Sequence, residues 1–448
     1  MTEQSLASGG KPWLLTGIGQ RPKVVLTSPA AYEDVFKTQF DVFVRGPGET
    51  VLEVLGQGIF NVDGDKWRHQ RRVTSHLFSM HMLKDCMKSV VREKTVQLRE
   101  VLATCAERGQ TVSMKSLLNK FTADTFTRIG FGVDLNGLAD PVDVDTSQPL
   151  DTALGVVQTR LQSPVWLWKP RRFFNVGSER VMRENMQQVQ DTVQKIMAKS
   201  LADKEHQANG EEATTSSKHK DLMSLMLQSG DFTDPREVRD ICVNFYAAGK
   251  DTTAFSLSWF IVMMNRHPRV LCKVREELRR VAPELFTGEL DTPTLGHLQQ
   301  LTYLEAALKE SLRLNSLAVY RLANRDTTLS DGTFVPKDAR AVFSMYASAR
   351  QPSVWGSDAA DYNPGRWIDE ETGKLSSFKF VTFSAGPRQC IGMRLAMMEM
   401  MTVLSVVFSR FDLETVVDPL DITYDFSLVL PVKGSLAVRV HSLSAHMA

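Results

Sequence analysis

One cysteine, Cys390, lies in a glycine-punctuated segment, Phe383–Gly392, that is followed directly by an apolar run with helical periodicity. A thiolate placed just before a helix N-terminus is stabilised by backbone amides and by the positive end of the helix dipole, so it is a strong metal ligand. Gly386 and Gly392 allow the backbone to approach a flat cofactor, and Arg388 offers a cation to an anionic group. An isolated cysteine is more often a buried apolar residue, but these surroundings favour the ligand.

A second segment with chemical potential, Ala247–Phe260, lies in the middle of a long periodic run over residues 235–265. A glycine inside a helix, here Gly249, costs about 1 kcal/mol relative to alanine. The adjacent hydroxyls of Thr252 and Thr253 can donate to carbonyl groups of the preceding turn and open it. The sequence therefore predicts a weak point in a helix of about 45 Å, although a tolerated flaw in a core helix would have the same residues.

Two pairs of residues are spaced to share one face of a predicted helix. Glu310 and Arg313 are spaced i, i+3, which in isolation predicts a surface ion pair worth about 0.3 kcal/mol. Trp67 and Arg71 lie one turn apart and point the same way, so both can donate hydrogen bonds to one anionic group.

The composition is that of an ordinary globular protein. The 448 residues include 53 Lys+Arg against 52 Asp+Glu, and this balance excludes the broad basic surface that a nucleic-acid partner requires. A hydrophobic content of 43% is too high for intrinsic disorder. The five cysteines are scattered singly, which argues against a disulfide framework or a structural zinc site.

Helical periodicity dominates the chain and changes to period two in two places, so we expect a mainly α fold with small β-sheets. The predicted helices cover residues 29–40, 63–78, 81–105, 181–206, 235–265, 269–281 and 303–314, and the predicted strands lie within 326–350 and 427–441. The polar segment 209–220 is expected to be a loop. No linker or repeat divides the chain, which predicts a single domain over residues 1–448. From the residues at the N-terminus we expect no signal peptide, membrane anchor or hinge.

Phe383, Gly386, Arg388, Cys390 and Gly392 resemble, position for position, the haem-ligand loop of the cytochrome P-450 monooxygenases. The resemblance runs from about residue 27 to residue 441. It implies the cytochrome P-450 fold, with haem b (iron-protoporphyrin IX) held between the long central helix and the helix that follows the cysteine. In that family the cysteine is the axial thiolate of the haem iron, so Cys390 is the expected metal ligand.

The central segment also resembles the family, in which it lies beside the haem and the bound oxygen. The resemblance implies that Ala248 and Gly249 line the cofactor and that Asp251 and Thr252 are catalytic, because they supply protons during oxygen activation. A hydroxyl with a carboxylate behind it is a chemically reasonable relay for this task.

The resemblance assigns the basic residues to the two haem propionates. Trp67, Arg71 and Arg388 match the family's donors, and a further donor is expected after the Glu/Arg helix, where Arg321 or Arg325 could serve. The assignment between these two is open because the family's prolines in that stretch are absent.

In the family, the residues matching Glu310 and Arg313 pair with an arginine that corresponds to Arg366. Three interlocked charges are costly to bury unless all are mutually bonded, so we expect this cluster to be structural. The family usually has an acidic residue where Gly365 stands.

Within the superfamily, the segments around residues 165–182, 248–260 and 376–392 resemble plant and fungal fatty-acid hydroxylases that oxidise long chains at or near the terminus. The resemblance implies a monooxygenase that uses O2 to hydroxylate a small apolar substrate. Substrate contacts are expected around Phe60, Phe245, Ala248 and Leu428, although plain core residues would have the same types.

No dinucleotide-binding fingerprint is present, so electrons are expected from a separate NADPH-dependent flavoprotein reductase, docked near Arg68 and Arg72. We expect a monomer, and the resemblance implies the endoplasmic reticulum membrane. A haem-thiolate isomerase or dehydratase that needs no reductase is one alternative, which the pair Asp251 and Thr252 argues against. A non-catalytic haem-binding protein is the other, which Gly365 and the missing prolines keep open.

Overall fold

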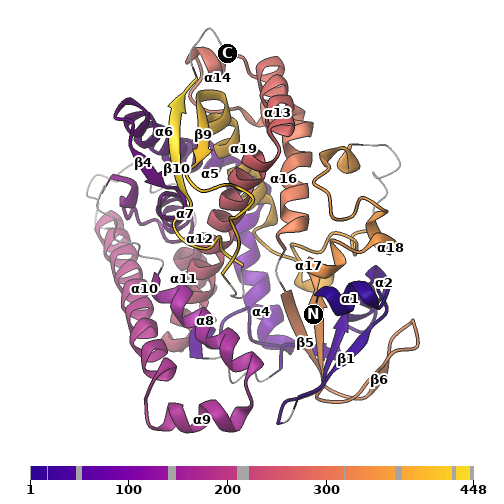
Figure 1. Cartoon of the computed structure of the whole chain (residues 1–448). Helices are drawn as coiled ribbons and strands as arrows, with labels where there is room; N and C mark the ends of the chain where they lie inside the picture. The colour runs from indigo at the N-terminus through magenta and orange to yellow at the C-terminus, as the bar shows by residue number, and fades with distance from the viewer. Residues whose placement is uncertain are drawn as a thin grey trace.

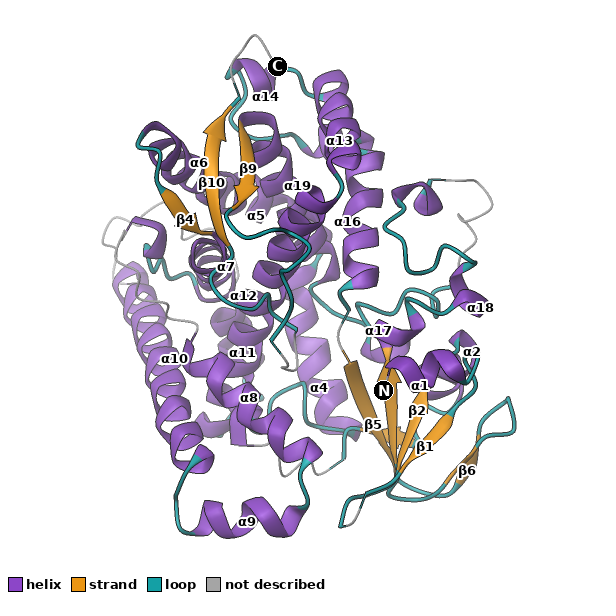
Figure 2. Ribbon diagram, viewed as in Figure 1, coloured by secondary structure: helices purple, strands orange, loops and turns teal. Residues whose placement is uncertain are grey.

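A computed structural model of the chain describes residues 2–17, 19–46, 53–139, 148–208, 221–316, 318–368, 376–425 and 430–443. The architecture is mainly helical with small sheets (Figures 1 and 2), as the periodicity predicts. The helical part surrounds one long central helix, and the largest sheet lies at the side of the molecule near the N-terminus (Figure 1). The predicted loop 209–220 lies outside the described residues.

The α-helices are α1 (Thr2–Ala7), α2 (Pro29–Glu33), α4 (Gly64–Ser75), α5 (Met80–Cys86), α6 (Arg92–Glu107), α7 (Met114–Phe131), α8 (Gln148–Gln162), α9 (Val165–Phe173), α10 (Ser178–Ala208), α11 (Leu222–Ser229), α12 (Pro235–Arg266), α13 (Pro268–Val281), α14 (Glu284–Thr287), α15 (Leu295–Gln300), α16 (Thr302–Leu314), α17 (Met345–Ser348), α18 (Pro352–Trp355) and α19 (Met393–Arg410). Shorter helical turns are η1 (Asp34–Thr38), η2 (His76–Phe78), η3 (Met87–Val91), η4 (Gly137–Ala139), η5 (Pro364–Trp367) and η7 (Gly386–Arg388). The predicted helix over 81–105 is thus divided by the π-helical turn η3 into α5 and α6.

The strands are β1 (Trp13–Leu15), β2 (Lys23–Leu26), β3 (Phe43–Val44), β4 (Thr111–Ser113), β5 (Ala318–Ala323), β6 (Thr327–Thr328), β7 (Phe334–Val335), β8 (Arg340–Ser344), β9 (Phe411–Thr415) and β10 (Ala437–Ser442). They form a five-stranded sheet in the order β1-β2-β8-β5-β3, a three-stranded sheet β4-β10-β9 and the pair β6-β7. In the first sheet, β3 pairs with β5 in a register that sets Val44 against Leu322. Because the two strands are antiparallel, Arg45, which follows β3, lies next to Arg321 of β5.

The central helix α12 has 32 residues and so measures about 48 Å. It begins where Asp234 accepts a hydrogen bond from the Arg236 amide and Pro235 occupies the first turn, and it ends before Pro268. Both halves of α12 are buried in two large apolar clusters, one shared with α7 and α19 and one shared with α8 and α10. This burial fixes the helix as the axis around which the other helices pack.

The charge cluster around Glu310 is fully bonded and buried, which confirms its structural role. The Glu310 carboxylate accepts hydrogen bonds from Arg313 Nε at 2.8 Å and from Arg366 Nε at 3.0 Å. It also accepts from Trp367 Nε1 at 2.9 Å and from the Asn363 amide at 3.0 Å. Every oxygen lone pair that burial removes from water is thereby compensated.

Besides Glu310, Arg366 forms an ion pair with Asp358 at 2.9 Å. An acidic residue at position 365 is therefore not needed to pair with the Arg366 guanidinium. Gly365 instead donates its amide to Asn363 Oδ1 at 3.0 Å, inside the turn η5.

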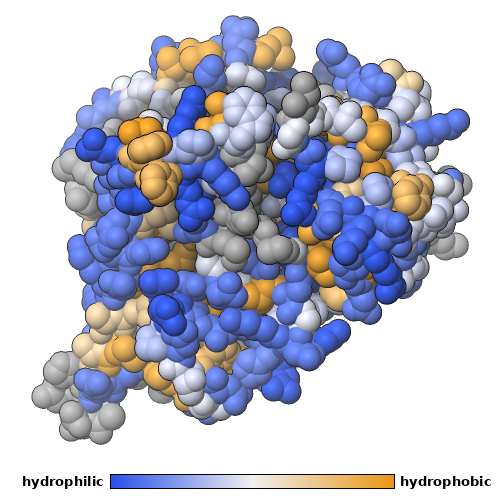
Figure 3. Space-filling view, turned by 90° about the horizontal axis from the view of Figure 1, so that it is seen from below, coloured by the Kyte–Doolittle hydropathy of each residue, from blue (hydrophilic) through white to orange (hydrophobic). Residues whose placement is uncertain are grey.

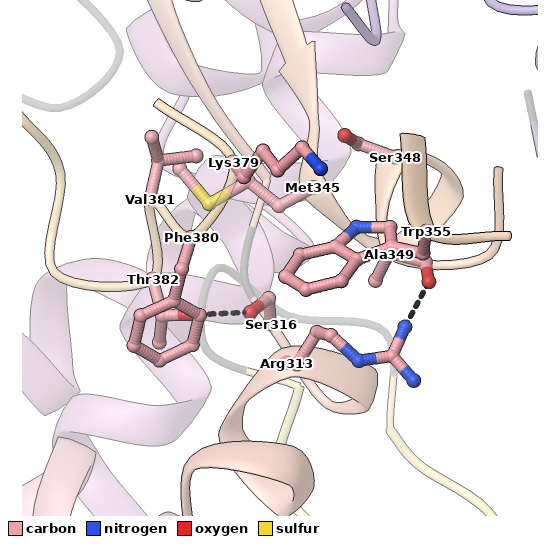
Figure 4. A pocket seen from close by; sticks show the side chains of 10 residues that line it. All are labelled: Arg313, Ser316, Met345, Ser348, Ala349, Trp355, Lys379, Phe380, Val381 and Thr382. Carbon is pink, nitrogen blue, oxygen red and sulfur yellow. Dashed lines mark hydrogen bonds between the residues drawn. The ribbon is translucent and has the colours of Figure 1, made fainter. Parts of the chain in front are cut away.

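A small cavity adjoins the cluster on the side of Arg313 (Figure 4). Its volume of about 10 Å³ leaves room for at most one water molecule. Arg313 donates to the Ala349 carbonyl at its edge, and the hydroxyls of Ser316 and Thr382, which also line it, share a hydrogen bond of 2.6 Å. The segment Lys379–Thr382, which leads to Phe383, forms one wall of this cavity.

Replacing Glu310 by Gln should lower the free energy of unfolding by about 3 to 5 kcal/mol, because two guanidinium groups lose their shared buried carboxylate. Urea unfolding measures this change. Glu305→Gln, which removes a half-exposed i, i+4 ion pair with Lys309 on the same helix, should cost less than about 1 kcal/mol. Equal costs for the two variants would contradict the role given to the cluster.

Glu399 in α19 is a second buried acid, and no cation accompanies it among the described residues. Burial raises the pKa of its carboxyl to about 8, and Oε1 has no hydrogen-bond partner in the described part of the chain. The folded state therefore keeps a proton that the unfolded state releases near pH 4.5, and this group makes the fold less stable as pH rises from 5 to 8.

Glu399→Gln should therefore stabilise the protein relative to wild type increasingly between pH 5 and pH 8. Chemical unfolding at several pH values tests this, with the exposed Glu205→Gln as a control that should show no such trend. A difference between Glu399→Gln and wild type that does not change with pH would refute it.

Candidate active site

The segment that carries Cys390 folds into a tight loop against the N-terminal part of the chain. The Cys390 amide donates to the Phe383 carbonyl at 2.8 Å, and Gln389 closes the turn η7 by donating to Gly386 at 3.0 Å. Gly386 has φ +65°, and a Cβ there would lie 2.0 Å from the carbonyl oxygen of Phe36. A glycine is required at this position both by the backbone conformation and by the close approach to η1.

The thiol of Cys390 combines accessibility with desolvating surroundings. The side chain is accessible to solvent, yet burial by the surrounding protein raises the pKa of the thiol. Backbone amides of Gly392 and Met393, at the start of α19, and the Arg71 guanidinium act in the opposite direction and stabilise the thiolate. A cation bound at the sulfur would shift the balance to the thiolate, because a metal ligand is deprotonated.

Helix α12 presents a narrow accessible face in its otherwise buried middle. Ala248 and Thr252 are exposed and Ser256 is half-buried, whereas most residues around them from 241 to 264 are buried. The spacing of four residues places these three side chains on one face. Thr252 donates its hydroxyl to the Ala248 carbonyl at 2.8 Å, and Ser256 donates to the Thr252 carbonyl at 2.7 Å. The hydroxyl bonds back as predicted, but α12 continues through this point without a break.

Gly249 and Asp251 lie on other sides of α12. A Cβ on Gly249 would lie 2.1 Å from the Phe126 ring of α7, so the glycine permits the close contact of these two helices. Asp251 is 2% exposed and forms an ion pair with Lys250, which is equally buried. Burial alone would lower the pKa of Lys250, but Asp251 and Tyr246 raise it. The structure therefore joins Asp251 to a buried cation, while Thr252 points to the accessible face.

Four arginines lie beside helix α4 and the cysteine loop: Arg45, Arg71, Arg321 and Arg388. Asp63 is the carboxylate beside three of them: it accepts from Arg388 Nη2 at 2.7 Å and from the backbone amide of Arg45 at 3.1 Å, and its charge also acts on the guanidinium groups of Arg45 and Arg321. This explains why Asp63, at the N-cap of α4, does not cap the helix with its side chain.

The cluster carries more positive than negative charge. Burial and the repulsion of Arg388 lower the pKa of Arg45 to about 10, and burial with repulsion from Arg45 and Arg388 lowers that of Arg321 strongly. Such a set of desolvated cations needs an anion to be stable. The two propionates of haem b match this demand in charge and chemistry, so the residues fit that cofactor.

Three of the predicted propionate donors belong to this cluster: Arg71, Arg321 and Arg388. Trp67 is buried, and the Arg388 guanidinium lies 4.5 Å from the centre of its ring. Arg321 belongs to the cluster, whereas Arg325 is exposed. Sequence reasoning missed Arg45, because it follows a two-residue strand and becomes a neighbour of Arg321 only through the pairing of β3 with β5.

The residues expected to contact substrate differ in their exposure to solvent. Ala248 is on the accessible face, and Phe60 is 41% exposed with the Arg45 guanidinium 4.0 Å from its ring centre. Phe245 is buried and stacks on Phe78 at 6.1 Å, so in this structure it is a core residue. Leu428 lies outside the described residues.

A sequence profile described as cytochrome P-450 matches residues 6–437. The chain belongs to the cytochrome P-450 family. Members of this family are monooxygenases that bind haem b through a cysteine thiolate. The predicted family and fold are confirmed.

Similar curated proteins come from plants. Cytochrome P-450 704C1 of Pinus taeda is 34% identical over 88% of this chain and 79% of its own length. Cytochrome P-450 94B1 of Arabidopsis thaliana is 32% identical over 96% of this chain and 81% of its own length. Cytochrome P-450 94A2 of Vicia sativa is 30% identical, covering 94% and 82%.

No helix within the described ranges is both long enough and apolar enough to cross a bilayer.

Gly249→Ala should destabilise the cytochrome P-450 fold by about 1 to 3 kcal/mol, because the added methyl group overlaps the Phe126 ring. Gly155→Ala in α8, where a Cβ would meet nothing within 4 Å, is the matched control and should stabilise by up to about 1 kcal/mol. Thermal or chemical unfolding measures both. The steric account fails if Gly249→Ala is as well tolerated as Gly155→Ala.

Proposed function

We propose that this cytochrome P-450 hydroxylates a long-chain fatty acid at or near its terminus, with electrons from a separate NADPH-dependent flavoprotein reductase. The observation that carries the proposal is the accessible Cys390 thiol beside a buried excess of arginine charge. Family membership supplies the reaction class. The fatty-acid substrate is supported by the resemblance of residues 165–182, 248–260 and 376–392 to hydroxylases of long chains.

Cys390 is proposed as the residue whose thiolate would bind the haem iron, held in place by the loop that starts at Phe383 and by the amides of Gly392 and Met393. Haem, when bound, supplies the activation of dioxygen that no amino-acid side chain provides. Trp67 and the four arginines of the cluster would donate to its propionates: Arg45, Arg71, Arg321 and Arg388. These residues would set the orientation of the flat cofactor and compensate the charge of its carboxylates.

Thr252 is proposed to hold and pass a proton on the accessible face of α12. Its hydroxyl already donates to the Ala248 carbonyl, so it releases that acceptor when it turns toward the reacting site. Asp251 is proposed as the acid that resupplies this proton, which requires it to leave its buried ion pair with Lys250. Gly249 supports this arrangement by letting α12 lie close to α7.

Ala248, a small residue on the accessible face, leaves room for an alkyl chain, and Phe60 contributes an apolar wall. Arg68 and Arg72 are exposed on α4 and are proposed as part of the reductase docking face. We further propose that the protein acts as a monomer at the endoplasmic reticulum membrane.

The experiment combines purified protein, reductase, NADPH and a panel of fatty acids, sterols and terpenoids, with spectral titration and mass spectrometry of products. Terminal or near-terminal hydroxylation of long-chain acids that depends on NADPH supports the proposal. Rearranged products formed without NADPH would identify an isomerase, and binding without any product would identify a non-catalytic haem protein. Turnover confined to another substrate class would overturn the fatty-acid assignment.

Thr252→Ala should reduce the product formed per NADPH consumed by about tenfold, because the proton on the accessible face is lost. Oxygen uptake and product are measured together. Ser256→Ala, which removes the next hydroxyl on the same face, is the control and should keep normal coupling. A fully coupled Thr252→Ala variant would contradict the relay.

A further inference from the structure

The segment from residue 55 to residue 60 lies along α12 and is bonded to it by two polar side chains, here called the α12 clamp: Asp240 and Asn244. The Asn244 side chain accepts a hydrogen bond from the Phe60 amide at 3.0 Å and donates to the Leu55 carbonyl at 2.5 Å, so it holds both ends of the segment. Asp240, one turn earlier, accepts from the Gln57 amide at 2.8 Å. The two side chains therefore fix the backbone of the segment against the helix.

The contact between the segment and α12 is close and buried. Asn244 is 4% exposed, so hydrogen bonds to the segment replace those to water. A Cβ on Gly58 would lie 2.3 Å from Asn244 Nδ2, and this approach therefore requires glycine. Gln70 of α4 adds a further support, because it donates to the Gln57 carbonyl at 3.0 Å and to Glu237 at 2.7 Å. The segment is thus held in one place by α12 and α4 together.

The α12 clamp continues the row of side chains that forms the accessible face of α12. Asn244, Ala248 and Thr252 are spaced four residues apart, so neighbours in this row lie one above the other. The clamped segment therefore ends one helical turn from Ala248. Its last residue, Phe60, is also joined to the arginine cluster, through the contact of its ring with the Arg45 guanidinium.

Exposure of the Phe60 ring is not by itself evidence of a site. Apolar side chains stand between hydrophilic ones on the face of the molecule that Figure 3 shows, and single ones need no explanation. For Phe60 a second observation counts, because its own amide is held by a buried side chain of the helix that carries Thr252. The α12 clamp thereby fixes one particular apolar surface beside the accessible face.

We propose that Asn244 is a positioning residue for the substrate. By bonding the Phe60 amide, it sets the distance between the Phe60 ring and the accessible face of α12, and thereby the length of alkyl chain that fits and the carbon that is oxidised. The inference rests on the hydroxylation proposed above, in which Phe60 is an apolar wall. One methylene group in an apolar site changes binding by about tenfold or more, so a wall displaced by one carbon has a measurable effect.

A series of alkylimidazoles tests the proposal without turnover. Their ring nitrogen binds a haem iron, so absorption titration of the full, haem-containing chain reports how affinity depends on chain length. For wild type, affinity should rise over chains of about 4 to 12 carbons up to a limiting length and then fall. Asn244→Ala should raise this limiting length and weaken the best wild-type ligand about tenfold. With reductase, NADPH and a fatty acid, the same variant should change the carbon that is hydroxylated.

Two further variants show whether Asn244 acts through Phe60. Phe60→Ala should reproduce the change in limiting length, and the double variant Asn244→Ala with Phe60→Ala should change it no further, because both remove the same wall. Asp240→Ala frees the Gln57 amide and leaves that of Phe60 bonded, so it should give a smaller change in the same direction.

Asn265→Ala is the matched control. Asn265 lies on the same helix and also bonds in both directions, since it donates to the Ile261 carbonyl at 3.0 Å and accepts from the Thr415 amide at 3.2 Å. Its loss should leave the limiting length unchanged. The unshifted haem spectrum of each variant verifies folding, and if Asn244→Ala does not hold haem, Asp240→Ala and Phe60→Ala decide.

The inference is overturned if Asn244→Ala binds the series as Asn265→Ala does, or if the effects of Asn244→Ala and Phe60→Ala add. It is also overturned if Asp240→Ala and Phe60→Ala change the limiting length in opposite directions. A wild-type protein that shows the limiting length but does not hydroxylate fatty acids would contradict the proposed function, while the alkylimidazole series still decides the role of Asn244.

Discussion

The arrangement of the site depends on a buried excess of positive charge beside a desolvated thiol. Arg45, Arg321 and Arg388 repel one another around Asp63, and burial has removed the water that would otherwise stabilise them. Cys390 lies next to this cluster through Arg71, in surroundings that favour the neutral thiol. A cofactor with two carboxylates and a cationic metal centre satisfies both demands at once, which is why haem b and this protein fit each other.

The fold meets this constraint through close backbone approaches at two glycines. Gly386 lets the cysteine loop touch the carbonyl of Phe36, and Gly249 lets α12 rest on Phe126. The pairing of β3 with β5 brings two arginines that are far apart in sequence to one end of α4. The bonded triad of Glu310, Arg313 and Arg366 secures the chain that leads into the loop.

Local motifs made much of this predictable from the sequence. The loop from Phe383 to Gly392 and the helical pair of Glu310 and Arg313 carry their pattern within a few residues, so fold class and family followed from them. Arg45, the contact of Gly249 with Phe126 and the ion pair that holds Asp251 could not be predicted with equal certainty. They depend on strand register and helix packing, which join residues distant in the chain.

The most direct test of the account is the absorption spectrum of the purified protein after reduction and exposure to carbon monoxide. Thiolate ligation by Cys390 predicts a strongly red-shifted Soret band that Cys390→Ser abolishes and that Cys272→Ser, at an exposed cysteine, leaves unchanged. A Soret band without that shift in the wild-type protein, or one that survives in Cys390→Ser, would contradict the central claim.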